Sequence, residues 1–283
     1  MDFTSEQARH KYDAFVAAAP AAVVGLDMDG TLSPIVDDPA LAHVHPDAPE
    51  VLVEVARAVR AVAIITGRPA RQALALGGLD EVGEAIAADG RELYVFGQYG
   101  HERWSSSQRR VVSPRPPAGL GRFLAELPAV LRRADAATAY VEEKGLGVAV
   151  HTRRMPDPAE ALDRILAPMT ELATRHGLLV EPGRNVVEVR APGVDKGWAV
   201  HTLAREQDAG GFLFAGDDLG DVEAFAAVDE LAGGGLATLL VCSASREQSA
   251  LRERADVVVP GPEGVLGLLR QLAEDVGLSR RRR

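Results

Sequence analysis

The feature that most restricts the fold of this chain is the stretch from Val23 to Ile35, VVGLDMDGTLSPI. It begins with the apolar residues of a buried strand and then places two carboxylates, Asp27 and Asp29, two residues apart. Gly30 follows and indicates a tight turn just past the strand end. Both carboxylates are therefore expected at the carboxyl edge of a sheet, where open α/β folds place their ligand sites.

Two anions this close together repel and raise one another's pKa unless a cation lies between them. Mg²⁺ is a hard cation that takes oxygen ligands, so it is the natural partner. The string Asp-X-Asp-Gly also begins the calcium loops of EF-hands. Here an apolar strand precedes the string and Thr-Leu-Ser-Pro follows the glycine, where an EF-hand needs further acidic or amide residues. The sequence therefore favours a magnesium site.

Length and composition restrict the class of protein. The 283 residues suffice for one large or two modest domains, and 47% hydrophobic with 25% charged residues is typical of a globular chain. A formal charge of −10 argues against a nucleic-acid partner. The N-terminal stretch lacks the order of a signal peptide, and no apolar run is long enough to cross a bilayer. We expect a cytoplasmic protein without a membrane partner.

Hydrophobic periodicity predicts alternating strands and helices at both ends of the chain. Before the middle segment, we expect helices at 5–18 and 47–59 and strands at 23–26, 61–65, 85–87 and 92–96. Residues 33–46 show no period, and their prolines and aspartates indicate a flap or hairpin. The run 97–104 reads as a strand with a close backbone approach at its glycines. After residue 190 we expect helices at 198–206, 222–228 and 265–276 and strands at 212–215, 237–242 and 256–259.

The middle segment has a different order of elements. From about Gln108 the pattern predicts a helix, two strands, a second helix and two more strands, at 120–132, 139–143, 146–152, 158–176, 178–180 and 186–190. This order is typical of an inserted α+β module of domain size. We therefore predict an α/β fold with a Rossmann-like, doubly wound, mainly parallel core at 1–108 and 190–283, and an inserted α+β domain at 109–189.

Further polar groups follow later strands or open later helices. Thr66 comes at a strand end before a helix, where its hydroxyl could bind a phosphate oxygen or simply cap that helix. Lys196 opens another helix, with an exposed ion pair as the ordinary alternative. The strand at 212–215 runs into three carboxylates, Asp217, Asp218 and Asp221.

This set of residue types suits phosphoryl transfer through an enzyme carboxylate. A phosphate monoester is anionic, so Mg²⁺ and a lysine are needed to neutralise its repulsion of an anionic nucleophile. A carboxylate nucleophile then forms an aspartyl phosphate, which divides one difficult displacement into two steps. The leaving alkoxide needs a proton, so a second carboxyl must start protonated and later accept a proton from water.

The string Asp-X-Asp-Gly-Thr-Leu after a buried strand resembles the first motif of the haloacid-dehalogenase-like phosphatases. The resemblance implies that Asp27 is the nucleophile and a metal ligand. It implies that Asp29 is the general acid and base, with its backbone carbonyl on the metal.

The later motifs extend this resemblance, because Thr66-Gly67-Arg68 is similar to the second motif of these phosphatases. The resemblance implies that Thr66 and Lys196 hold the transferring phosphoryl group and that Gly67 and Arg68 contact the substrate. It implies that Asp217 binds Mg²⁺. It also implies that Asp218 and Asp221 either hold the metal ligands in place or bind Mg²⁺ through a water molecule.

The strings VEEKGLGVAVHTRR, GRNVVEVRAPGVDKG and GDDLGDVEAF closely resemble the trehalose-6-phosphate phosphatase family. With the first motif, these matches are spread over most of the chain, from residue 23 to residue 225. The resemblance implies a cap domain in which Glu142, Lys144 and Glu188 hold a sugar, and these residue types suit a polyhydroxylated ligand. It further implies Mg²⁺-dependent hydrolysis of trehalose 6-phosphate to trehalose and phosphate, and a functional link to a trehalose-6-phosphate synthase.

The chain departs from the family pattern at two places. Gly220-Asp221-Val222-Glu223 stands where Thr-Asp-Glu-Asp is usual, and Gly97-Gln98-Tyr99-Gly100 stands where Gly-X-His-Gly is usual. The second departure concerns a loop that contacts the sugar in this family. Two alternatives therefore stay open: a phosphatase of another glycosyl or pseudo-disaccharide phosphate, such as sucrose phosphate or mannosylglycerate phosphate, and a catalytically idle regulator that binds sugar phosphate. The complete set of acids and metal ligands argues against the idle regulator.

Overall fold

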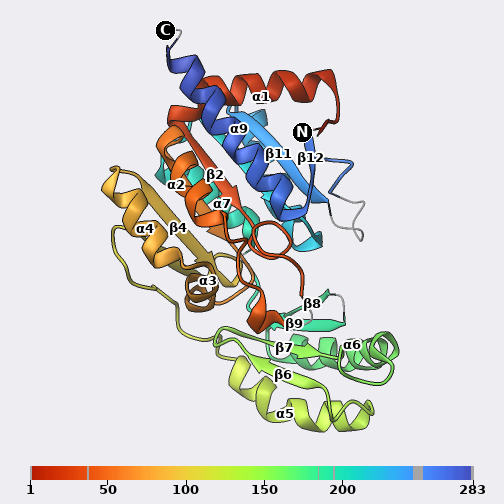
Figure 1. Ribbon diagram of the computed structural model, residues 1–283. Helices are drawn as coiled ribbons and strands as arrows, with labels where there is room; N and C mark the ends of the chain where they lie inside the picture. Colours follow the sequence, from red (N-terminus) through yellow and green to blue (C-terminus); the bar gives the residue numbers. More distant parts are fainter. Residues whose placement is uncertain (1, 37, 184, 194, 245–250, 282–283) are drawn as a thin grey trace. The chain divides into compact units, whose positions relative to one another are not determined.

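A computed structural model describes residues 2–36, 38–183, 185–193, 195–244 and 251–281 of the chain (Figure 1). The chain forms two compact units, one of residues 1–112 together with 194–283 and one of residues 113–193. Each unit contains its own sheet and its own hydrophobic core.

The first unit is built around an eight-stranded sheet in the order β1-β12-β11-β10-β2-β3-β4-β5. Its strands are β1 (Asp2–Phe3), β2 (Ala22–Leu26), β3 (Ala61–Ile65), β4 (Glu92–Gly97), β5 (Glu102–Ser105), β10 (Gly211–Gly216), β11 (Ala237–Ala244) and β12 (Val257–Pro260). All strands from β12 to β4 run parallel, and β1 and β5 pair antiparallel at the two edges. The predicted α/β class with a mainly parallel sheet is confirmed.

Helices cover both faces of this sheet, which explains why the central strands are continuous apolar runs. Every residue of β2 and β3 is buried, as expected for strands packed on two sides. On one face lie α1 (Glu6–Ala18), α2 (Ala48–Ala58), α3 (Ala70–Gly77), α4 (Leu79–Ala88) and α9 (Gly261–Arg281) (Figure 1). On the other face lie α7 (Lys196–Glu206) and α8 (Val222–Gly233). Among the described helices, none combines the length and the apolar composition that crossing a bilayer requires.

The second unit is a smaller α+β structure. Its four antiparallel strands are β6 (Tyr140–Glu143), β7 (Gly147–His151), β8 (Leu179–Gly183) and β9 (Val186–Arg190), in the order β6-β7-β9-β8. Two helices, α5 (Leu120–Arg133) and α6 (Pro158–Arg175), share a core with one face of this sheet. Because side chains alternate along a strand, Val187 and Val189 enter that core while Glu188 and Arg190 lie on the opposite face.

One strand predicted in the first unit is wrong. The strand expected at 85–87 is part of α4, in which Leu79, Val82 and Ile86 are buried at helical spacing. An alanine-rich apolar run of three residues looks the same in either structure, and packing on the sheet decides. Of the flap or hairpin predicted at 33–46, no hairpin forms in the described part, which contains the short 3-10 helix Pro39–Leu41 and an isolated bridge of Ser33 with Asp29, and the flap stays a prediction. Asp37 lies outside the described residues.

The close approach predicted at the end of β4 is confirmed. A Cβ atom on Gly97 would lie 2.4 Å from the backbone nitrogen of Ala70. Only glycine therefore lets the end of β4 pack against the start of α3. The chain then turns through the 3-10 helix Gln98–Gly100 into β5.

Candidate active site

The predicted catalytic residues follow neighbouring parallel strands at one edge of the sheet. Leu26 of β2 pairs with Ile64 of β3 and with Ala215 of β10. Asp27, Thr66 and Asp217 consequently lie just beyond the carboxyl ends of three adjacent strands, and all three are buried. The backbone N–H of Asp27 still donates to the carbonyl of Ala215 at 2.9 Å, which holds the start of the loop against β10.

Lys196 is buried at the start of α7 and joins two carboxylates. Its Nζ donates to Oδ1 of Asp27 at 2.6 Å and to Oδ1 of Asp221 at 2.7 Å. Burial disfavours the ammonium charge, but Asp221 and Asp27 together hold the pKa of Lys196 well above its usual range. The alternative of an exposed surface ion pair is therefore wrong for this lysine, whose side chain is 4% exposed.

Asp27, Asp217 and Asp221 form a cluster in which one oxygen from each residue lies within 4.8 Å of the others. Burial raises the pKa of Asp27 well above its usual range, although the charge of Lys196 lowers it. Burial, with the charges of Asp218 and Asp221, raises the pKa of Asp217 to about 8. Several buried carboxylates with one lysine leave excess negative charge, so the donor set fits a hard divalent cation.

The members of the cluster differ in how many hydrogen bonds their carboxylates already accept. Oδ2 of Asp221 accepts from the backbone N–H groups of Asp217 at 3.0 Å and Asp218 at 3.3 Å, and its Oδ1 accepts from Lys196. The Asp217 carboxylate has no hydrogen bond or ion pair within the described ranges. Asp221 therefore fits the positioning role expected of it, whereas Asp217 has oxygens available for a cation.

Asp29 lies outside this cluster and pairs with Arg68. Nε of Arg68 donates to Oδ2 of Asp29 at 2.6 Å, and Nη2 donates to Oδ1 at 2.7 Å. Nη1 of Arg68 donates to the carbonyl of Pro39 at 2.9 Å. Both oxygens of Asp29 thus accept a hydrogen bond from Arg68. The contact of Arg68 with substrate stays a prediction.

Two motif glycines are required by their neighbours. Gly30 has a φ of +73°, and a Cβ atom there would lie 2.0 Å from Oδ2 of Asp217. A Cβ atom on Gly67 would lie 2.8 Å from Cζ of Tyr99. Any side chain at either position would therefore displace a residue of the site. Beside Gly67, the hydroxyl of Thr66 accepts from the backbone N–H of Arg68 at 3.2 Å.

The turn after β4 supports the Thr66–Arg68 loop, whereas the family resemblance implied only a contact with the sugar at this turn. The N–H of Gln98 donates to the carbonyl of Arg68 at 2.8 Å, and that of Tyr99 donates to the carbonyl of Thr66 at 2.9 Å. Both residues have left-handed backbones, with φ of 48° and 61°. Nε2 of Gln98 is buried without a hydrogen-bond partner in the described structure. The only sequence signal was the departure Gly97-Gln98-Tyr99-Gly100 from the family pattern.

The three expected sugar ligands share one face of the sheet in the second unit. Glu142 lies opposite Ala149, and Ala149 lies opposite Glu188. Lys144 forms an ion pair with Glu188. Nε2 of His151 lies 3.0 Å from Oε2 of Glu142. His151 was not predicted, although its spacing from Ala149 places it on this face.

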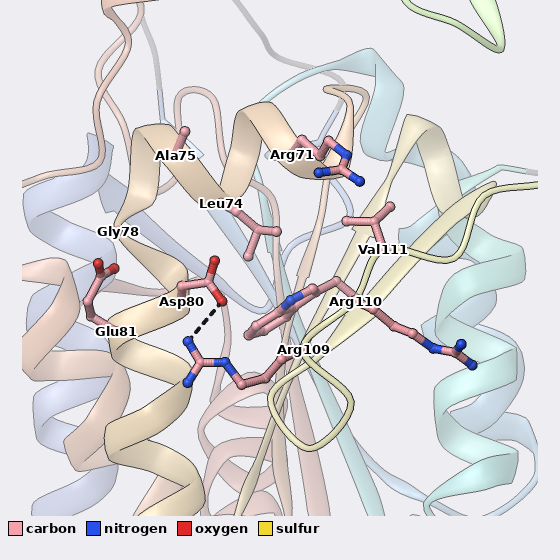
Figure 2. A pocket seen from close by; sticks show the side chains of 10 residues that line it. Arg71, Leu74, Ala75, Gly78, Asp80, Glu81, Arg109, Arg110 and Val111 are labelled. Atoms are coloured by element: carbon pink, nitrogen blue, oxygen red, sulfur yellow. Dashed lines mark hydrogen bonds and ion pairs between the residues drawn. The ribbon is translucent and has the colours of Figure 1, made fainter.

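A separate hollow of about 510 Å³ on the first unit lies between α3, α4 and residues 109–111 (Figure 2). None of the predicted site residues lines it. Arg109 turns toward Asp80, with a nitrogen–oxygen distance of 3.4 Å (Figure 2). Arg109 also pairs with Glu84. Three arginines and two carboxylates line the hollow, so it contains no cluster of carboxylates like that at the sheet edge.

Residues 25–258 match the model of the trehalose-phosphatase family. The chain belongs to this family. A trehalose-phosphate phosphatase of Mycobacterium tuberculosis (strain ATCC 25618 / H37Rv) is 33% identical over 220 residues, covering 75% of this chain and 52% of the relative. A protein of the same strain described as an uncharacterized glycosyl hydrolase is 35% identical over 217 residues, covering 72% of this chain and 15% of the relative. This member of the trehalose-phosphatase family thus spans about half or less of these curated relatives.

Solved structures show the same fold. The C-terminal domain of trehalose-6-phosphate phosphatase from C. albicans superposes with a TM-score of 0.75 and 18% identity, covering 96% of this chain and 98% of that one. At this level of identity the likeness concerns the fold of the family member and not its substrate.

Proposed function

We propose that the chain is a Mg²⁺-dependent phosphatase that hydrolyses trehalose 6-phosphate to trehalose and phosphate. The observation that carries this proposal is the buried network in which Lys196 joins Asp27 and Asp221 beside the unpaired carboxylate of Asp217. This network places a candidate nucleophile (Asp27), a cation (Lys196) and a carboxylate available to bind a metal (Asp217) at one edge of the sheet. Membership of the trehalose-phosphatase family and the name of the mycobacterial relative support the choice of substrate.

In the proposed reaction Asp27 attacks phosphorus while the bond from phosphorus to the sugar oxygen breaks. Lys196 holds one oxygen of Asp27 and neutralises charge, so the other oxygen is the attacking atom. The sugar oxygen leaves with a proton from Asp29, once Arg68 has released that carboxyl. Asp29 then accepts a proton from a water molecule that attacks the aspartyl phosphate, which releases phosphate and regenerates Asp27.

Asp27, Asp217 and the backbone carbonyl of Asp29 are the proposed holders of Mg²⁺. When bound, the ion neutralises charge on the phosphoryl oxygens. Asp218 and Asp221 keep the loop after β10 in place. Asp218 accepts from the N–H of Gly220 at 2.8 Å, and Asp221 accepts from the N–H groups of Asp217 and Asp218.

Mg²⁺ is expected to stabilise the fold, and to do so more at pH 8 than at pH 5. The pKa of Asp217 is raised from 3.8 to about 8, so between these values the folded state binds more protons than the unfolded state. The unfolding free energy of the metal-free protein therefore falls as pH rises through this window. Bound Mg²⁺ offsets the loss by pairing with ionised carboxylates. Thermal midpoints with Mg²⁺ or with chelator measure this, and a larger shift at pH 5 would contradict it.

The unit of residues 113–193 is the proposed cap domain, in place of the boundaries 109–189 drawn from the sequence. Glu142, Lys144 and Glu188 are its proposed sugar ligands. The core motifs meet the phosphoryl group that all phosphate monoesters share, so selection among sugars requires further polar groups such as these.

Glu142→Ala is expected to lower kcat/KM for trehalose 6-phosphate by at least about tenfold, equivalent to roughly 1.4 kcal/mol. Hydrolysis of a small aryl phosphate should change much less, because its leaving group has no hydroxyls to pair. Glu126→Ala is a matched control, since Glu126 also pairs with a histidine, His176, at 2.9 Å in the same unit. Equal losses on both substrates would show that Glu142 supports the protein and does not bind the sugar.

Phosphate release from a panel of sugar phosphates tests the proposed function directly. With Mg²⁺, trehalose 6-phosphate should give the highest kcat/KM, and excess chelator should abolish turnover. A preference for sucrose phosphate, mannosylglycerate phosphate or another glycosyl phosphate would keep the chemistry and replace the substrate. No release from any member would favour a regulator that binds sugar phosphate. The cytoplasmic location and the link to a trehalose-6-phosphate synthase stay predictions from the sequence.

A further inference from the structure

Ser243 of β11 makes a buried hydrogen bond to the loop that contains the candidate nucleophile. Its Oγ donates to the carbonyl of Gly30 at 2.6 Å, across 213 residues of sequence. The Ser243 side chain has no exposed surface. Ser243 lies on the same face of β11 as Leu239 and Val241, which are core residues. A buried hydroxyl at the end of this apolar row costs free energy unless it forms a hydrogen bond, and its partner is the carbonyl of Gly30.

The position of Ser243 in the sheet brings it level with the acidic cluster. Gly216, the last residue of β10, pairs with Cys242 of β11. The next residues along the chain are Asp217, just after β10, and Ser243 of β11. Gly30 is close to both residues. Its carbonyl accepts a hydrogen bond from Ser243, and a Cβ atom on Gly30 would lie 2.0 Å from Oδ2 of Asp217. The conformation of Gly30 thus determines how closely the loop approaches the Asp217 carboxylate.

The loop around Gly30 is a tight turn. The N–H of Gly30 donates to the carbonyl of Ser33 at 2.8 Å, and the N–H groups of Leu32 and Ser33 donate to the carbonyl of Met28 at 2.8 Å. These bonds close the turn on itself. Asp27 holds the start of the loop against β10, whereas Ser243 of β11 holds the turn at Gly30. Within the described chain, the carbonyl of Gly30 accepts no other hydrogen bond. Without Ser243, this carbonyl would be buried and unpaired, and the turn would shift to satisfy it.

We propose that Ser243 is a positioning residue for the divalent-cation site. By fixing the Gly30 carbonyl, it sets the placement of Asp27 and Asp29, which flank the turn, against Asp217. The inference rests on the metal site of the proposed function. Groups that orient metal ligands from behind typically change metal affinity by about 10- to 100-fold when they are removed.

The test is the affinity for Mn²⁺, measured from the signal of free Mn²⁺ in electron paramagnetic resonance, without substrate or turnover. Ser243→Ala should bind Mn²⁺ at least about tenfold more weakly than the wild-type chain. Thr152→Val is the matched control. Thr152 is a fully buried residue of the other unit, and its Oγ1 donates to the backbone carbonyl of Pro158 at 2.7 Å. Thr152→Val should lower the unfolding midpoint but leave the Mn²⁺ affinity unchanged.

Four outcomes would overturn the inference. Ser243→Ala could bind Mn²⁺ as tightly as wild type, or Thr152→Val could weaken binding to the same degree. If the wild-type chain binds no Mn²⁺, both the proposed metal site and the inference are refuted. If the wild-type chain and Ser243→Ala bind Mn²⁺ with equal affinity, only the inference is refuted. Should Ser243→Ala not fold, Ser243→Cys keeps a side-chain donor, but a weaker one. Its affinity should also fall, and full affinity in that variant would overturn the inference.

Discussion

Asp27→Asn should abolish phosphate release, lowering kcat by at least about a thousandfold. The substitution removes the attacking oxygen and one charged candidate metal ligand while keeping the size and shape of the side chain. The amide cannot form an acyl phosphate that water then hydrolyses. The fold should persist, because Lys196 keeps its second partner, Asp221, at 2.7 Å.

The control for this variant is Asp89→Asn, which removes a charge from an exposed ion pair with Arg57. Its activity should equal that of wild type. Mass spectrometry of acid-quenched wild-type enzyme should find the phosphoryl adduct on the peptide that contains Asp27, and Asp27→Asn should lack it. A folded Asp27→Asn protein that turns over near the wild-type rate would refute the covalent mechanism.

Lys196→Met should lower the free energy of unfolding by about 3–5 kcal/mol, in addition to eliminating activity. Removal of one partner leaves Asp27 and Asp221 buried without their counter-ion, which is more costly than the loss of the ion pair itself. Methionine keeps most of the volume of the lysine stem, so a cavity contributes little. Denaturant unfolding without metal measures this effect.

Two further variants separate charge burial from other causes. Arg57→Gln removes a cation from an exposed pair and should cost about 1 kcal/mol or less. Adding Asp221→Asn to Lys196→Met removes one of the stranded carboxylates and should recover part of the lost stability. If Lys196→Met were as stable as Arg57→Gln, the buried ion-pair network would not hold the site together as described.

Sequence patterns were sufficient where a local signal reports burial. The all-buried strands β2 and β3 appear as runs of apolar residues, because a strand between two helix layers has no exposed face. The aspartates and Thr66 follow such runs directly, so their location at one sheet edge could be expected. The pattern was insufficient for α4, since a short alanine-rich run has no period that distinguishes helix from strand.

Pairings between distant segments could not be predicted from the sequence. Lys196 reaches Asp27 across 169 residues, and Arg68 reaches Asp29 across 39. Both lysine and arginine are exposed in most proteins, so residue type alone favours a surface role. Burial beside carboxylates depends on which strands are neighbours in the sheet, and no local period encodes that order.

Motifs and apolar runs are properties of adjacent positions, so they were enough to predict the family, the α/β class and the candidate site residues. The partners of the polar groups depend on the folded chain: Arg68 for Asp29, Lys196 for Asp27, and Ser243 for the carbonyl of Gly30. These contacts arise where parallel strands end side by side. Their geometry follows from sheet register and from the requirement that buried polar groups be paired, which act across the whole chain.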